Sequence, residues 1–220
     1  MQPMGEILMK KKTERKMWGQ MKILIVYCHP STDSFTYGVK EAFIKGIREA
    51  GHSYEVSDLY QMGFQPVMSE NEYLREAFYR EDLPLPQDVI TEQEKINHAD
   101  MAVFIYPVFW TAAPAVLEGW FQRVWTYGFA YGSKPTMRKL KKTYFLVTMG
   151  GSLHDEIRKY EVEAMKAVMV GDRMHNRTEE SEFIVFDEMT RGYGNDSKRM
   201  DNIEKFTRMA YELGKTKCFI

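Results

Sequence analysis

The sequence has 220 residues, of which 44% are hydrophobic and 28% charged, and its formal net charge is -1 at pH 7. This length and apolar content suit one well-filled domain, since no linker rich in glycine, serine or proline divides the chain. The near-neutral charge gives no electrostatic reason to expect nucleic acid binding, and the longest apolar runs are too short for membrane insertion. These totals favour a protein that handles small molecules.

The cysteines and the N-terminal segment bear on location and domain organisation. Cys28 and Cys218 are too few for a disulfide framework, which favours a reducing compartment and predicts a cytoplasmic protein. Residues 1–20 carry five basic side chains and no apolar stretch of a signal peptide. We expect a basic extension without a part in the chemistry, or alternatively an arm that packs on a partner subunit. The predicted domain then covers residues 21–220.

Hydrophobic periodicity predicts alternating strands and helices from residue 21 onward. Residues 21–28 are mainly isoleucine, leucine and valine, which is typical of a central parallel strand, and apolar residues from Phe35 to Ile47 recur at helical spacing. Gly51 stands where a helix commonly ends. In chain order the predicted elements are strand 21–28, a helix from 34 that ends before 51, strand 52–59, helix 69–80, helix 87–99, strand 100–106, helix 111–127, strand 142–148, helix 160–170, strand 182–188 and helix 201–213.

This alternation predicts the fold class. Strands that alternate with helices form a parallel sheet with helices on both faces and right-handed crossovers. We therefore predict an α/β protein, a flavodoxin-like three-layer sandwich with a five-stranded parallel sheet of order 2-1-3-4-5. Ligands of such folds bind at the carboxyl ends of the strands, near the switch in strand order.

Three loops should meet at that edge of the sheet. The first, residues 29–35, is rich in hydroxyl groups and opens a helix, so the free N–H groups of the helix could bind a phosphate. It matches neither the Walker A pattern nor the G-x-G-x-x-G turn. The simpler interpretation makes Ser34 a helix N-cap and His29 a surface residue.

The second and third loops would complete a site for a flat ring. Residues 107–111 offer apolar and aromatic faces, although aromatic residues there could equally fill the core, as we expect for Trp120 and Trp125. In residues 148–152 a pair of glycines can bring backbone N–H groups close to a ligand. Together the three loops fit a flavin better than another cofactor.

The blocks 29–43, 107–131 and 148–152 carry a family resemblance. The chain resembles the flavodoxin-like NAD(P)H quinone dehydrogenases, the DT-diaphorase group, together with the modulator of drug activity B type. The resemblance implies a homodimer in which bound FAD, or FMN, takes hydride from NAD(P)H and passes two electrons to a quinone or similar acceptor. The cofactor-binding residues that it implies are His29, Ser34, Phe35, Pro107, Val108, Phe109, Trp110, Thr148, Gly150 and Gly151.

The sequence departs from the family pattern after the glycine loop. The family has a tyrosine and a histidine there that assist proton delivery, and His154 and Tyr160 are candidates for this catalytic role by location alone. Thr36 replaces a family asparagine. Arg199 falls near a family arginine that contacts the adenine half of FAD, which favours FAD over FMN. The alternatives are an electron carrier or ancillary flavoprotein of potassium efflux, and an interaction domain without cofactor.

Overall fold

The computed structural model describes residues 19–216, so residues 1–18 of the predicted extension and Cys218 lie outside the described part. Within 19–216, no helix combines the length and the apolar character needed to cross a membrane. The elements in chain order are β1 (Lys22–Tyr27), α1 (Phe35–Glu49), β2 (Ser53–Asp58), α2 (Glu70–Ala77), α3 (Gln87–His98), β3 (Met101–Pro107), α4 (Ala115–Val124), β4 (Leu140–Thr148), α5 (Glu156–Lys166), the π-helix η1 (Ala167–Met174), the 3₁₀ turn η2 (His175–Arg177), β5 (Thr178–Phe186) and α6 (Asp196–Thr216).

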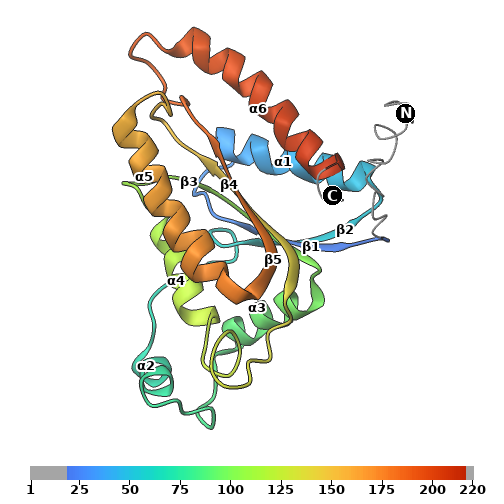
Figure 1. The fold of residues 1–220 in the computed structure, drawn as a ribbon, viewed down its shortest axis with the longest axis vertical. Helices are drawn as coiled ribbons and strands as arrows, with labels where there is room; N and C mark the ends of the chain where they lie inside the picture. The colour runs from blue at the N-terminus through green and yellow to red at the C-terminus, as the bar shows by residue number, and fades with distance from the viewer. Residues whose placement is uncertain (1–18, 217–220) are drawn as a thin grey trace, which may run out of the picture.

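The five strands form one sheet in the order β2-β1-β3-β4-β5. Every neighbouring pair is parallel, with Ile25 opposite Val103 in β1 and β3 and Phe145 opposite Phe183 in β4 and β5. Because all strands run in one direction, their carboxyl ends share one edge of the sheet (Figure 1). The predicted fold class and strand order are confirmed.

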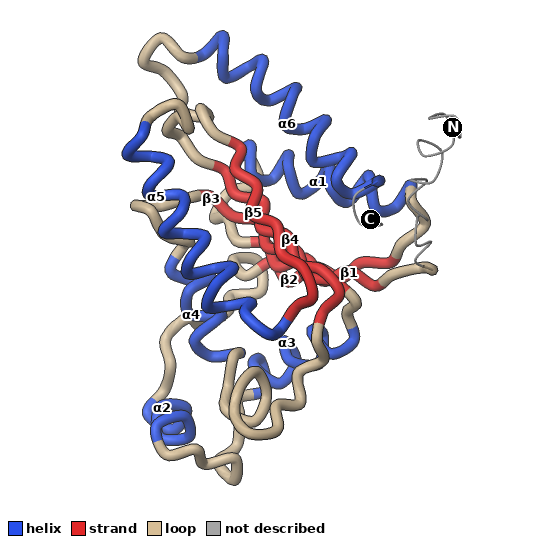
Figure 2. The backbone as a smooth tube through the Cα atoms, in the orientation of Figure 1, coloured by secondary structure: helices blue, strands red, loops and turns tan. Residues whose placement is uncertain are grey.

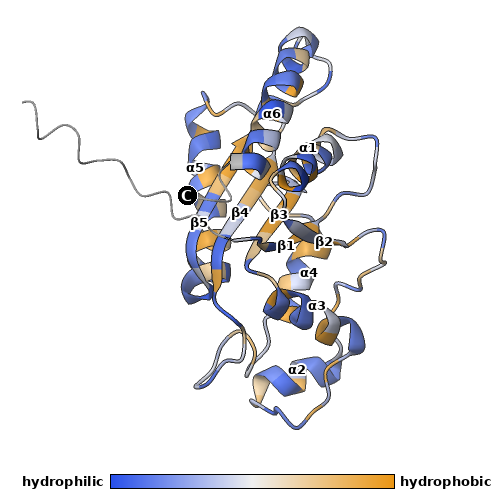
Figure 3. Ribbon diagram, turned by 90° about the vertical axis from the view of Figure 1, so that its right-hand side faces the viewer, coloured by the Kyte–Doolittle hydropathy of each residue, from blue (hydrophilic) through white to orange (hydrophobic). Residues whose placement is uncertain are grey.

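Helices cover both faces of the sheet (Figures 1 and 2). On one face, α1 and α6 pack on side chains such as Ile23 and Ile25 of β1. On the other, α3, α4 and η1 pack on the alternate side chains, including Leu24. All residues of β3 are buried, as expected for a strand covered twice. Figure 3 shows the apolar sheet between helices whose outer faces are hydrophilic.

The predicted helix 111–127 is wrong at its start. α4 begins only at Ala115, because Phe109 and Ala112 form a tight bridge and Thr111 has a left-handed φ of 58°. Pro114 then takes the N-cap position with an extended ψ of 142°. Trp120 lies fully buried in this helix, in agreement with its interpretation as a core residue.

Other predicted boundaries are also wrong. β5 begins at Thr178 rather than 182, since polar residues on an edge strand hide its start from an apolar pattern. α5 begins at Glu156, where Asp155 caps it by accepting from the N–H of Ile157, and continues as the π-helix η1. α6 runs from Asp196 to Thr216, several residues longer than predicted at the N-terminal side.

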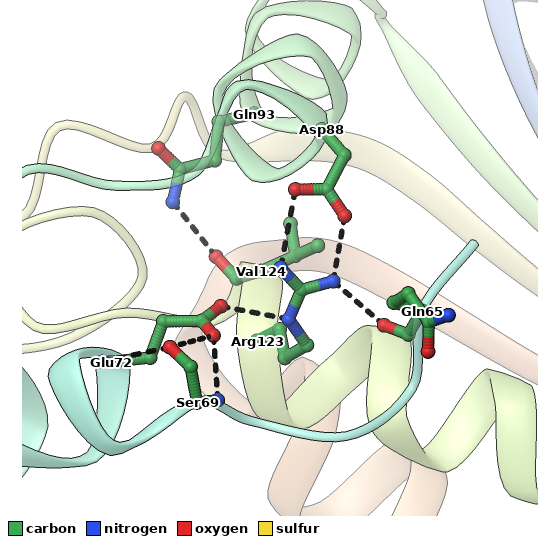
Figure 4. Close-up of polar contacts among 7 residues, drawn as sticks. All are labelled: Gln65, Ser69, Glu72, Asp88, Gln93, Arg123 and Val124. Carbon is green, nitrogen blue, oxygen red and sulfur yellow. Dashed lines mark hydrogen bonds and ion pairs between the residues drawn. The ribbon is translucent and has the colours of Figure 1, made fainter.

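A buried arginine joins α2 to the body of the protein (Figure 4). The guanidinium of Arg123 donates to the carboxylate of Glu72 at 2.7 Å, to both oxygens of Asp88 at 2.6 and 3.1 Å, and to the carbonyl of Gln65 at 2.6 Å. Ser69 and Glu72 form a capping box at the start of α2. The segment that leaves the sheet after β2 is therefore held against α3 and α4.

Candidate functional site

A pocket of about 350 Å³ opens at the carboxyl ends of β1, β3 and β4. The three predicted loops meet there, so the position expected from the strand order and the pocket coincide. The pocket brings together eight of the predicted cofactor-binding residues, and their roles toward a flavin stay predictions. Its lining residues are His29, Asp33, Ser34, Phe35, Thr36, Pro107, Val108, Thr148, Met149, Gly150, Met189, Arg191 and Arg199.

The start of α1 presents backbone donors to the pocket. Ser34 is the N-cap, and its hydroxyl oxygen accepts from the N–H of Tyr37 at 3.1 Å, while the N–H of Gly38 bonds to the Ser34 carbonyl. The first N–H groups of a helix have no partner inside it. Those of Phe35 and Thr36 therefore remain for a ligand, and the positive end of the helix dipole favours an anion.

His29 is oriented by the backbone of its own loop. Its Nδ1 lies 3.0 Å from the N–H of Ser31 and 2.9 Å from the Ser31 carbonyl. The amide can only donate and the carbonyl can only accept, so Nδ1 accepts from the amide in one tautomer of the ring and donates to the carbonyl in the other. Burial lowers the pKa of His29, although the Ser31 carbonyl opposes this shift because it accepts from the protonated ring. At neutral pH the ring is therefore an uncharged hydrogen-bond donor.

Hydrogen bonds fix the second and third loops relative to α1. The N–H of Val108 donates to the Thr148 carbonyl at 2.8 Å, which extends the pairing of β3 and β4 beyond their ends. The hydroxyl groups of Thr36 and Thr148 lie 2.7 Å apart and are buried. The floor of the pocket is therefore a rigid part of the fold.

A fourth loop, which the sequence did not indicate, completes the site. Residues 187–195 follow β5 and are hydrogen-bonded to the glycine loop: Met189 N–H donates to Met149, Glu188 N–H to Gly151, and the Thr190 hydroxyl to Gly150. The close contact leaves no room at Gly150, where an added Cβ would lie 2.6 Å from the Thr190 hydroxyl. A side chain at this position would have to displace the Thr190 hydroxyl from its bond to the Gly150 carbonyl.

Two arginines give one side of the pocket a positive charge. Arg199, on α6, donates through Nε to the Met189 carbonyl at 3.2 Å. Arg191 lies on the fourth loop and has no ion-pair or hydrogen-bond partner among residues 19–216. Asp33 is the single acidic residue in the lining. The lining therefore has a net positive charge, and we expect it to attract a phosphate.

Five predicted site residues do not line the pocket. Phe109 is 46% exposed and Trp110 is 100% exposed, so neither faces the pocket as the aromatic loop was expected to do. A Cβ on Gly151 would meet the side chain of Arg158 instead of the cavity. His154 is exposed, and Tyr160 is 77% exposed on α5. A catalytic role for either residue stays a prediction.

The backbone explains why the aromatic loop turns outward. Trp110 and Thr111 both have left-handed conformations, with φ of 52° and 58°. Such a φ is unfavourable for a β-branched residue such as Thr111 and is commonly found at functional sites. The loop therefore carries its two aromatic side chains to the surface beside the pocket.

The site also contains residues that sequence reasoning missed. Asp33 and Met149 lie within two of the predicted loops, but no pattern assigns them a role, and the family resemblance marks Thr36 only as a replacement. Met189 and Arg191 follow a fifth strand that is predicted to run on to Glu188, and no motif marks the turn after it. An end of β5 at Phe186 would have placed both residues at the same edge as the other loops.

Comparison with known proteins agrees with this fold. Residues 21–173 match the family model for the flavodoxin-like fold. NAD(P)H dehydrogenase (quinone) 1 of Rattus norvegicus is 35% identical over 148 residues, which cover 60% of this chain and 54% of that protein. The chain thus spans about half the length of the curated relatives it matches first.

Two solved structures extend the comparison. NAD(P)H:quinone oxidoreductase from Methanothermobacter marburgensis superposes with a TM-score of 0.80 at 40% identity, over 89% of this chain and 98% of that chain. An FMN-dependent NADH-azoreductase from Bacillus anthracis, solved with FMN, has a TM-score of 0.68 at 13% identity, over 89% of this chain and 100% of that chain, and shows the fold alone. The chain belongs to the flavodoxin-like family, in the group of the NAD(P)H quinone dehydrogenases.

Proposed function

We propose that this protein is a flavin-dependent oxidoreductase that takes hydride from NAD(P)H and passes two electrons to a quinone or a similar small acceptor. The observation that carries the proposal is the pocket at the carboxyl edge of the sheet, where free helix N–H groups, an apolar wall and a glycine loop meet. The rat and Methanothermobacter relatives, which are named as an NAD(P)H dehydrogenase (quinone) and an NAD(P)H:quinone oxidoreductase, support it.

The phosphate of the flavin would bind at the start of α1. The N–H groups of Phe35 and Thr36 and the ring of His29 are the donors available there. We propose FAD as the cofactor, because Arg191 and Arg199 add two guanidinium groups that could bind a second phosphate, with FMN as the alternative.

The ring would lie between Pro107 and Val108 on one side and the backbone of residues 148–150 on the other. A bound flavin supplies the redox chemistry, since it can accept a hydride and release two electrons to a quinone. The task of this chain is to orient the ring and to place backbone N–H dipoles where negative charge develops. Gly150 suits this task because it lets the Thr190 hydroxyl approach and donate to its carbonyl, which holds the glycine loop in place.

We further propose that the protein is a cytoplasmic homodimer. The buried Cys28 is a free thiol, which is typical of a reducing compartment. Exposed aromatic residues beside α2, described below, support self-association.

The proposed function can be tested on the purified protein. We expect a yellow solution with an absorbance band at about 450 nm, and acid extraction followed by chromatography should release FAD. We also expect NAD(P)H-dependent reduction of menadione, which separates an enzyme from an electron carrier. A colourless protein that does not take up added flavin would refute the proposal.

A variant of Gly150 tests the position of the flavin. Gly150→Leu should lower flavin occupancy at least tenfold, because its side chain displaces Thr190 and with it the fourth loop that completes the pocket. Gly171→Leu, at an open position on η1, is the matched control and should keep its flavin. Full occupancy in a folded Gly150→Leu protein would place the flavin elsewhere.

A further inference from the structure

A second concave site lies at the opposite edge of the sheet from the proposed flavin pocket. It has a volume of about 280 Å³ and is formed by the loop that leads into β4 and the turn η2 that leads into β5. Because both strands begin there, this site is separated from the carboxyl edge by the length of the sheet (Figure 1). Its lining residues are Ala130, Tyr131, Gly132, Pro135, Met137, Lys139, His175, Asn176 and Arg177.

The polar lining of this second site is basic. Lys139 comes from one segment and His175 and Arg177 from the other, and no acidic residue lines the cavity. Within residues 19–216, Lys139 has no ion-pair partner. Asp172, whose charge acts on Arg177, is itself paired with Arg173 at 2.9 Å. Two cations without a direct carboxylate partner among residues 19–216 therefore face one small cavity.

Arg177 is held in place by carbonyl groups and not by a carboxylate. Its Nε donates to Ala130 at 2.9 Å, and its Nη1 donates to Asp172 at 3.0 Å and to Arg173 at 3.3 Å. Its Nη2 has no partner in the described chain and remains available as a donor. Burial lowers the pKa of this guanidinium, so an anion nearby would stabilise its charged form.

The backbone around Arg177 is also fixed before any ligand binds. The preceding π-helix η1 is a rare conformation that occurs frequently at functional sites. Its end is anchored by the indole of Trp125, which donates to the Arg173 carbonyl at 2.7 Å. The cationic side of the cavity is therefore preorganised, and binding would cost little ordering of the chain.

From these contacts we propose that this cavity binds the phosphate group of a small phosphate monoester. Lys139 and Arg177 together carry two positive charges, which match a phosphate monoester of about −1.5 to −2 at pH 7 better than a carboxylate. Planar guanidinium groups favour such oxyanions. The lining also includes the apolar side chains of Ala130, Pro135 and Met137, which would contact the organic part of the ligand.

Titration calorimetry with phenyl phosphate as the probe tests this proposal. The protein keeps its native cofactor content and is titrated in a phosphate-free buffer. Lys139→Ala should weaken binding at least tenfold, since this side chain contributes charge but no bond to the fold. Lys134→Ala is the control: Lys134 is exposed in the same loop, does not line the cavity and should leave binding unchanged. Equal affinity in the Lys139→Ala variant and the wild type would overturn the proposal.

Two further measurements separate this site from other phosphate sites. Inorganic phosphate should bind more weakly than phenyl phosphate, and equal affinity would overturn the assignment of an ester because the apolar side chains of the lining would contribute nothing. The flavin absorbance should stay unchanged during the titration. Release of flavin by the probe would instead place its binding in the pocket at the carboxyl edge and refute the second site.

Discussion

Arg191 allows the choice of cofactor to be tested with a single side chain. It lines the proposed flavin pocket without a partner among residues 19–216, so its substitution removes charge but no bond of the fold. We expect Arg191→Gln to weaken FAD binding about tenfold and FMN binding by much less, because only FAD has a second phosphate. Fluorescence titration of the flavin-free protein with each cofactor measures both affinities.

The control for this experiment is Arg208→Gln, an arginine on α6 that lies outside the pocket. Both affinities should remain at the wild-type value in this variant. If Arg191→Gln weakened FAD and FMN equally, the second phosphate would not bind at Arg191.

At the scale of single residues, the sequence predicted positions better than orientations. Ser34 could be placed because it begins a helix, and Thr148 because it ends a strand. The pocket contains both residues. Trp110 could not be placed, since its exposure results from two consecutive left-handed residues that no pattern marks. Arg191 was missed because the end of β5 was predicted two residues too late.

At the scale of elements, the packing of α1 on α6 depends on two glycines. An added Cβ on Gly46 would lie 2.2 Å from the Tyr211 carbonyl, and one on Gly214 would lie 2.3 Å from the Phe43 carbonyl. The neighbouring atoms are backbone and cannot rotate away. Gly46→Ala should therefore lower the free energy of unfolding by about 2–3 kcal/mol, measured by urea denaturation.

Gly38→Ala provides the matched control on the same helix. A Cβ there meets nothing within 4 Å, so the higher helix propensity of alanine should raise stability by about 0.5–1 kcal/mol. Opposite signs for the two variants are the expected result. Equal effects would show that α1 and α6 are not in close contact.

The attachment of α2 predicts a dependence of stability on pH. Burial raises the pKa of Glu72, but its bonds from Ser69 and Arg123 outweigh this effect and the net pKa is lowered from 4.5. A group whose pKa is lower in the folded state stabilises the protein at any pH above its pKa in the unfolded state. This stabilisation is lost as the pH falls through the pKa of the folded state. Denaturation curves should therefore show constant stability above pH 4.5 from this group and a decline below it.

Glu72→Gln isolates this contribution. It should cost about 3 kcal/mol at pH 7, because the buried Arg123 loses one charged partner, and it should flatten the decline at acid pH. Asp82→Asn, in an exposed pair with Arg80, is the control and should change stability little. An unchanged acid profile in Glu72→Gln would contradict the role of this network.

Most elements could be predicted because burial on both faces leaves long apolar runs, as in β3. The failures share a physical cause: local geometry that does not change the pattern of apolar residues. Thr111 lies in a helical pattern but in a left-handed turn, and η1 keeps an amphipathic sequence while its turns widen to the π form. Thr178 begins a strand that has one neighbour and needs little apolar surface.

At the scale of the whole molecule, the surface beside α2 bears on the proposed homodimer. Tyr73, Phe78 and Tyr79 are 60%, 65% and 63% exposed, and we call these three residues the α2 aromatic patch. The ring of Tyr79 also packs against that of Tyr127 in a tilted arrangement, with ring centroids 4.9 Å apart. Exposed aromatic groups of this kind commonly mark an interface between proteins, which here we take to be a second copy of the chain.

The double variant Tyr73→Asp with Phe78→Asp tests this assignment. We expect the wild type to sediment with twice the mass of one chain and the variant as a monomer, because two buried charges would oppose association. Ile157→Asp, at a 69% exposed position on α5, is the matched control and should remain dimeric. A dimeric double variant would place the interface on another face, whereas a monomeric wild type would contradict the dimer itself.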